Sequence, residues 1–139
     1  MNKVKIIAEA GVNHNGDIEL AKELISAASE SGADVIKFQT FTAKEVVSEK
    51  APQAPYQSKN SRIKETQYEM LKKLELSKDS HFILKKKCDN LGIEFLSTAF
   101  DLNSLDFLVN DLDFKTLKIP SGEITNGALI LESALSGCD

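Results

Sequence analysis

The sequence is poor in residues that cross-link small proteins or bind structural zinc. It contains two cysteines, Cys88 and Cys138, which lie far apart with no second cysteine or histidine within a few residues of either. This spacing excludes a disulfide framework and a zinc ribbon. We expect both side chains to be free thiols.

Long hydrophobic runs and an excess of positive charge are also absent. No stretch approaches the roughly 18 apolar residues of a membrane span. The first three residues lead directly into a predicted strand rather than into the apolar core of a signal peptide. These features predict a cytoplasmic protein with no membrane partner. With 17 basic and 21 acidic residues and a net charge of −4, the chain also lacks the basic surface that nucleic acids need. The basic run 85–87 is predicted to be the solvated face of a helix.

The apolar residues, 42% of the chain, alternate between strand-like and helix-like spacing. The predicted strands span residues 4–8, 35–39, 93–97 and 116–119. The predicted helical faces are Ile18 to Ala28, Tyr68 to Leu74, Leu84 to Leu91, Leu102 to Val109, and Leu129 to Ala134. Asp17 and Ser77 are predicted helix N-caps, as is Thr125 or Asn126, and Gly32 and Gly92 are predicted helix ends. The order β-α-β-α-α-β-α-β-α predicts a parallel sheet, either half of a closed barrel or a small open sheet.

Polar residues follow or end every predicted strand, each time at its carboxyl end. They are Glu9, Lys37, Gln39, Thr98, Lys118, Ser121 and Glu123. In a barrel these strand ends meet at one mouth, so the side chains would share a single pocket. The arrangement is typical of an active site.

Two lysines in this set indicate what the pocket binds. Lys37 and Gln39 are two positions apart and point to the same face of the sheet, and Lys118 lies between two apolar residues of the fourth predicted strand. An inward ammonium needs an anion, which is either a ligand or a structural carboxylate such as Glu9 or Glu123. For two lysines at one mouth we favour a ligand. The Ser121-Gly122 turn offers a hydroxyl and backbone N–H groups that suit a phosphate.

The loop after the first strand, Asn13-His14-Asn15-Gly16, would overhang the pocket. His14 is either a metal ligand or a loop histidine that fixes the Asn-Gly turn. His81, within a helical pattern, is predicted to be structural.

Four segments in order resemble the signatures of bacterial sialic acid synthases: residues 8–16 (AEAGVNHNG), 36–40 (IKFQT), 96–101 (LSTAFD) and 118–123 (KIPSGE). The resemblance spans nearly the whole chain and includes synthases of N-acetylneuraminic, legionaminic and pseudaminic acids. It implies an α/β fold, the N-terminal half of a (β/α)8 TIM barrel with about four β/α units. Residues 1–139 would then be a partial synthase domain, with the rest of the barrel and an antifreeze-like domain beyond residue 139. Ala99 stands where the family usually has proline.

The resemblance also implies a reaction: phosphoenolpyruvate condenses with an N-acetylmannosamine-like amino sugar to a nine-carbon 2-keto acid and phosphate. The implied ligands of phosphoenolpyruvate are Lys37, Thr98, Lys118 and Ser121. Glu123 and Glu9 would be catalytic carboxylates, and Gln39 and Asn60 would bind the sugar. The implied cofactor is a divalent metal such as Mn²⁺, bound by histidines beyond residue 139. The full-length enzyme would be a homodimer, and the isolated segment would be inactive.

Two other functions fit parts of the pattern. In a Schiff-base aldolase, Lys37 or Lys118 would attack a carbonyl as a free amine. In the second alternative the protein is not an enzyme: the half-barrel would only bind an anion, and a symmetric dimer would cover its open strand edges.

Overall fold

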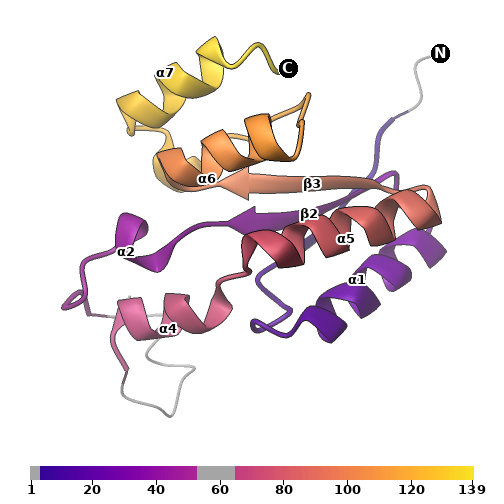
Figure 1. The fold of residues 1–139 in the computed structure, drawn as a ribbon, viewed down its shortest axis with the longest axis horizontal. Helices are drawn as coiled ribbons and strands as arrows, with labels where there is room; N and C mark the ends of the chain where they lie inside the picture. Colours follow the sequence, from indigo (N-terminus) through magenta and orange to yellow (C-terminus); the bar gives the residue numbers. More distant parts are fainter. Residues whose placement is uncertain (1–3, 53–64) are drawn as a thin grey trace.

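A three-stranded parallel sheet forms the centre of the molecule. The computed structural model describes residues 4–52 and 65–139. Strands β1 (Ile7–Gly11), β2 (Val35–Thr40) and β3 (Glu94–Ala99) lie in the order β1-β2-β3, with both pairs parallel (Figure 1). This arrangement confirms the predicted parallel α/β architecture.

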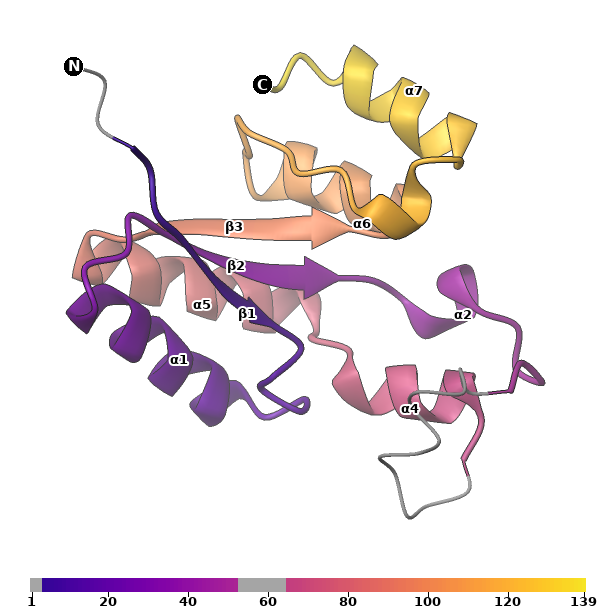
Figure 2. The same cartoon turned by 180° about the vertical axis from the view of Figure 1, so that it is seen from behind.

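The longer helices form the crossovers between the strands. Helices α1 (Ile18–Glu30) and α5 (Lys78–Leu91) lie side by side along one face of the sheet (Figures 1 and 2). The second crossover also contains α2 (Ala43–Val46) and α4 (Gln67–Leu74). Helix α6 (Leu102–Asp106) follows β3 and continues as a π-helical turn, Phe107–Asp111. A 3-10 turn (Ser121–Glu123) precedes the last helix, α7 (Gly127–Leu135), which packs on α6.

The predicted helix boundaries are confirmed by capping contacts. The Asp17 carboxylate accepts hydrogen bonds from the first turn of α1, and the Ser77 hydroxyl accepts one from Ser80 N–H at 3.1 Å. Asn126, rather than Thr125, caps α7. Gly92 ends α5 in the left-handed conformation, with φ 68°, which glycine adopts without strain.

The core lies between the sheet and the pair α1 and α5. Ile25, Phe38 and Leu84 are fully buried there, and so is Cys88, on the predicted helical face from Leu84 to Leu91. Both cysteines are free thiols, and burial raises the pKa of Cys88 to about 12. Three residues of the predicted helical faces are exposed: Leu91 in the last turn of α5, Leu102 at the start of α6, and Ala134, because Ser133 faces inward in α7 instead.

The first strand begins three residues later than predicted. Residues 4–6 are apolar enough for a strand but are exposed, and Ile6 is bonded instead to the turn before β2. Asp34 Oδ2 accepts a hydrogen bond from Ile6 N–H at 2.8 Å. Pairing therefore starts where β2 starts, opposite Ile7.

The predicted fourth strand, residues 116–119, was wrong for this chain. The backbone there bonds to Asp139: Leu117 N–H donates to its carbonyl at 2.8 Å, and Asp139 N–H donates to Lys115 O at 2.9 Å. In the described part of the chain β3 pairs only with β2. A strand needs a partner at ladder distance, which hydropathy cannot supply.

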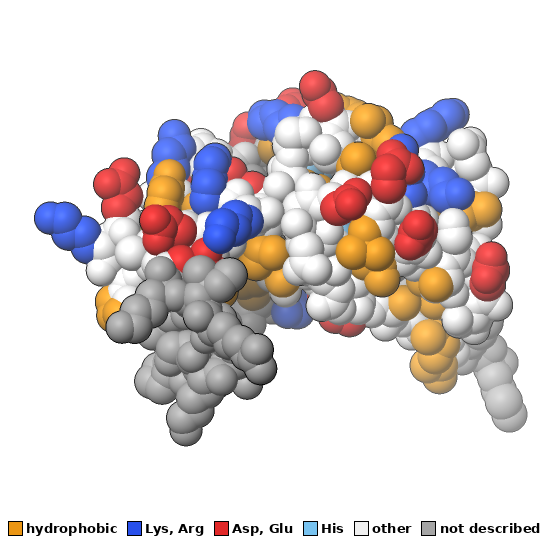
Figure 3. Space-filling view, turned by 90° about the horizontal axis from the view of Figure 1, so that it is seen from below, with side chains coloured by type: hydrophobic (Ala, Val, Ile, Leu, Met, Phe, Trp, Pro, Cys, Tyr) orange, Lys and Arg blue, Asp and Glu red, His pale blue; other side chains and the backbone are white. Residues whose placement is uncertain are grey.

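The surface carries both signs of charge. Figure 3 shows lysine side chains interspersed with carboxylates rather than gathered into one patch. Within residues 4–52 and 65–139, every helix is too short or too polar to cross a membrane.

Candidate active site

The carboxyl ends of the three strands bring together four of the predicted site residues. In the parallel register, Glu9 lies opposite Lys37, and Gln39 lies opposite Thr98. Paired residues of parallel strands point to the same face, so all four side chains share one face of the sheet. Phe38 and Thr40 point to the other face, where they contact His14 and His81.

Lys37 is the buried charge of this face. The residue is 9% exposed, and its ammonium forms an ion pair with the Glu9 carboxylate. Of the two alternatives for Lys37, the structure shows the ion pair with the carboxylate of Glu9, and the ligand favoured for the two lysines stays a prediction. The side chain of Glu9 itself remains 52% exposed, so the pair is open to solvent on the Glu9 side.

A β-bulge separates Glu9 from the next paired residue. Glu9 pairs with Lys37 and Gly11 pairs with Phe38, so Ala10 is the extra residue. Gly11 has φ 54°, and a Cβ atom there would lie 3.1 Å from Glu9 Oε1 and 3.4 Å from Gln39 Nε2. The side chains of Glu9 and Gln39 therefore approach the same stretch of bare backbone.

Thr98 has an unsatisfied hydroxyl. The residue is 1% exposed, and its Oγ1 has no hydrogen-bond partner among the described residues. A buried hydroxyl without a partner costs roughly 1–3 kcal/mol. Such a group on a polar face is suited to binding a ligand oxygen.

A second group of polar residues lies beyond the end of β3. Asp101 accepts hydrogen bonds from Ser104 N–H and Oγ–H, both at 2.8 Å, and from Thr42 N–H at 2.9 Å. It thereby joins the loop after β2 to the start of α6. A pocket of about 420 Å³ lies beside this contact, and its lining includes Asp101, Glu45, Glu123 and Asn126.

The remaining predicted site residues are not joined to Lys37. Lys118 and Ser121 are exposed, and within the described residues neither makes an ion pair or a side-chain hydrogen bond. Asn60 lies outside the described residues. The roles assigned to these three residues stay predictions.

His14 fixes the turn that follows β1. Its Nδ1 accepts a hydrogen bond from Gly16 N–H at 3.0 Å, which confirms the turn-fixing alternative. The ring is fully buried 6.0 Å from Phe38, and its Nε2 has no partner among the described residues. In the described ranges, no three His, Cys, Asp or Glu side chains come together as a metal site would require. These residues alone do not fit a metal ion.

A buried hydrogen-bond chain behind the site face was not predicted. Ser97 Oγ lies 2.6 Å from Thr40 Oγ1, which lies 2.8 Å from His81 Nε2. His81 Nδ1 lies 2.8 Å from Ser77 O and must donate to it. In the neutral imidazole, Nε2 then accepts a hydrogen bond from the Thr40 hydroxyl, and Thr40 Oγ1 accepts one from the Ser97 hydroxyl. These hydrogen bonds connect β2 and β3 to the start of α5, at the residues next to Gln39 and Thr98.

The burial of His81 and His14 predicts a loss of stability in acid. Burial lowers the pKa of His81, and also that of His14, below 6.5. The unfolded state therefore binds more protons, and the free energy of unfolding should fall as the pH drops below about 6.5, by up to about 1.4 kcal/mol per pH unit per histidine. Urea midpoints from about pH 7.5 to about pH 5.5 measure this loss. The His81→Gln protein should show a shallower dependence, and an identical slope would contradict the prediction.

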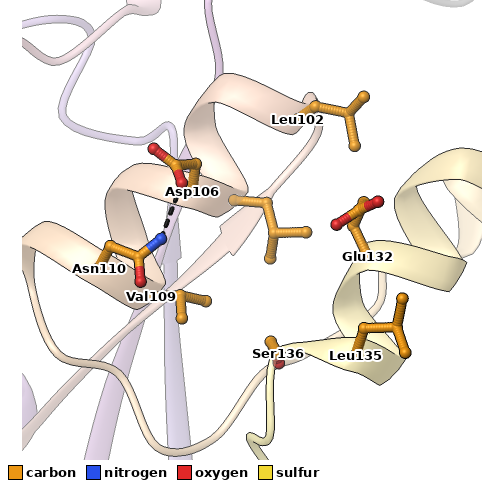
Figure 4. A pocket seen from close by; sticks show the side chains of 8 residues that line it. Leu102, Asp106, Val109, Asn110, Glu132, Leu135 and Ser136 are labelled. Carbon is orange, nitrogen blue, oxygen red and sulfur yellow. Dashed lines mark hydrogen bonds between the residues drawn. The ribbon is translucent and has the colours of Figure 1, made fainter.

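A further hollow, of about 440 Å³, lies between α6 and α7 and contains none of the predicted site residues. Figure 4 shows Leu102 and Val109 facing Leu135 across it, with Glu132 at its side and Asn110 bonded to Asp106 at 2.7 Å. Its lining includes neither a lysine nor a strand-end residue. The candidate site is therefore at the strand ends.

The model of the NeuB family matches residues 24–138, most of the chain and three of the four strand-end groups. The chain belongs to the NeuB family. Its fold is that of the TIM-barrel sialic acid synthases. In the N-acetylneuraminic acid (sialic acid) synthetase of Leptospira borgpetersenii, solved with citrate, the similarity covers 99% of this chain and 43% of that one, with a TM-score of 0.82 and 33% identity.

Two bacterial relatives are more similar in sequence. The N,N'-diacetyllegionaminic acid synthase of Legionella pneumophila is 60% identical over 121 residues, which is 87% of this chain and 34% of the relative. The Campylobacter jejuni enzyme of the same name is 56% identical over 126 residues, 91% of this chain and 37% of the relative. The chain thus spans about a third of the length of these curated relatives.

Proposed function

We propose that this chain supplies the phosphoenolpyruvate-binding part of a sugar-acid synthase. The observation that carries the proposal is the buried Lys37, which shares one sheet face with Glu9, Gln39 and Thr98 in a chain of the NeuB family. A buried ammonium and an unsatisfied hydroxyl are complementary to the phosphate and carboxylate of phosphoenolpyruvate. Lys118 and Ser121 complete this anion site in the proposal.

In the proposed reaction, C3 of phosphoenolpyruvate attacks the aldehyde carbon of an amino sugar, a C–C bond forms as the aldehyde C=O π bond breaks, and the aldehyde oxygen takes up a proton to become a hydroxyl. Water adds to C2, the bond between C2 and the phosphate oxygen breaks, and phosphate leaves. Glu123 orients this water or accepts its proton, Glu9 is the second carboxylate, and Gln39 and Asn60 contact the sugar. The proposal includes a divalent metal, Mn²⁺, bound by donors outside the described residues, and a homodimer in the cytoplasm.

The proposed sugar is an N-acetylmannosamine-like compound with a second acetamido group. The support is the name of the two relatives with 60% and 56% identity, which act as synthases of a diacetylated acid. A Schiff-base aldolase that uses Lys37 is less well supported, because an ammonium held in an ion pair has no free electron pair with which to attack a carbonyl. For Lys118, which has no such pair among the described residues, the support for a synthase over an aldolase is the family alone.

The test is an assay of the complete protein that contains these residues. With excess Mn²⁺, we expect phosphate release from phosphoenolpyruvate only when a 2-acetamido sugar is present, and faster release with the diacetamido sugar. No release with any such sugar would leave the anion-binding alternative. A pyruvate adduct trapped on a lysine by borohydride would support the aldolase instead.

A further inference from the structure

We infer that Asn126 is a positioning residue for Glu123, which it holds by a neutral hydrogen bond. The inference rests on the proposed function, since it adds a residue to the same site. Asn126 Nδ2 donates to Glu123 Oε2 at 2.9 Å, and Asn126 N–H donates to the Glu123 carbonyl at 2.9 Å. Both residues line the pocket beside the end of β3.

The amide of Asn126 is oriented at both ends. Its Oδ1 accepts a hydrogen bond from Leu129 N–H at 3.2 Å and caps α7, so its Nδ2 must face the carboxylate. Capping alone needs only a side-chain oxygen, and serine or aspartate provides one equally well. The amide carries its acceptor and its donor on separate atoms, Oδ1 for the helix and Nδ2 for Glu123, whereas aspartate has no donor and serine has one hydroxyl oxygen for both contacts. The helix cap and the carboxylate therefore form one unit.

The two carboxylates of the proposed mechanism, Glu9 and Glu123, differ in the charge of their hydrogen-bond donors. Glu9 is paired with a lysine, so its charge is balanced. Glu123 is bonded to an amide, which fixes Oε2 and leaves the charge unbalanced. Oε1 makes no hydrogen bond with any residue in 4–52 or 65–139, so it is the oxygen available to water at the substrate. The structure thus assigns the proton-accepting role to Glu123 Oε1 rather than to Glu9.

Three replacements in the complete protein separate positioning from capping. Asn126→Asp keeps a capping oxygen, has no donor and places a second carboxylate against Glu123. Asn126→Ser keeps a capping oxygen but replaces the Nδ2 donor with the same, shorter hydroxyl group. Asn126→Ala loses both functions. We expect the melting temperature to fall only for Asn126→Ala. We expect kcat to fall roughly 10-fold to 100-fold in all three, which is the effect of losing a hydrogen bond to a charged group.

The KM values for phosphoenolpyruvate and sugar are the second measurement. They should stay near those of the unaltered protein, because Asn126 touches Glu123 rather than either substrate. Normal kcat in the Asn126→Asp protein would overturn the inference alone, as would a kcat that falls only together with the melting temperature. If the unaltered protein released no phosphate under any condition, the proposed function itself would fail.

Discussion

Replacing Lys37 with methionine should nearly abolish activity of the complete protein and leave its stability almost unchanged. The ammonium is buried on the proposed anion site, and truncating one partner of such a charged contact costs about 2–5 kcal/mol, or roughly 30-fold to 4,000-fold in kcat/KM for phosphoenolpyruvate. Folding should tolerate the change, because methionine fills the space of the lysine stem and the released Glu9 carboxylate is half exposed. Steady-state kinetics and a urea melt measure the two effects separately.

The chain offers a matched control for this variant. Lys5 also pairs with a carboxylate, Glu94, at 2.5 Å, but at the amino end of the sheet and with both side chains about half exposed. Lys5→Met should change neither activity nor stability, since exposed pairs contribute at most about 1 kcal/mol. Full activity of the Lys37→Met protein would remove Lys37 from the anion site.

Replacing Gly16 with alanine should destabilise the protein by about 2–5 kcal/mol. Gly16 has φ 78°, and a Cβ atom there would lie 2.2 Å from the backbone carbonyl oxygen of Lys73 in α4. Backbone cannot move aside as a flexible side chain can, so either α4 or the loop after β1 must shift. Urea unfolding of the altered and unaltered proteins measures the cost.

Gly32 separates the clash from the conformational strain. It has the same φ, 78°, but a Cβ atom there would meet nothing within 4 Å. Gly32→Ala should therefore cost only the strain of the left-handed conformation, about 1–2 kcal/mol. Equal losses for the two variants would show that the contact between Gly16 and Lys73 is not limiting.

Local signals in the sequence were sufficient where local contacts decide the structure. Asp17, Ser77 and Asn126 cap their helices through bonds to residues two or three positions away. The shared face of Lys37 and Gln39 follows from strand geometry alone. The resemblance to the synthases gave the family, because four motifs lie in order along the chain.

Contacts between distant residues were missed or wrongly predicted. The 116–119 strand failed because its backbone partner is Asp139 rather than a neighbouring strand. The chain of Ser97, Thr40 and His81 left no signal, since its members are 41 and 57 positions apart. The bond from Asn126 to Glu123 could have been suspected, because residues three apart at a helix start often bond. Helix α2 was also missed, because its four residues are too few to show the helical spacing of apolar side chains.

The bulge at Ala10 has a consequence for how the site can vary. Between Glu9 and Gln39 the wall of the site is main chain, because Gly11 offers no side chain and its φ of 54° disfavours any other residue. A point substitution at Gly11 cannot enlarge the space beside this wall, because glycine has no side chain to remove. A larger residue would reduce that space, but only at the cost of a strained backbone. Proteins that share this strand end and accept different sugars must therefore differ in other side chains of the mouth, such as position 39, or in the loops around it, while this wall keeps its shape.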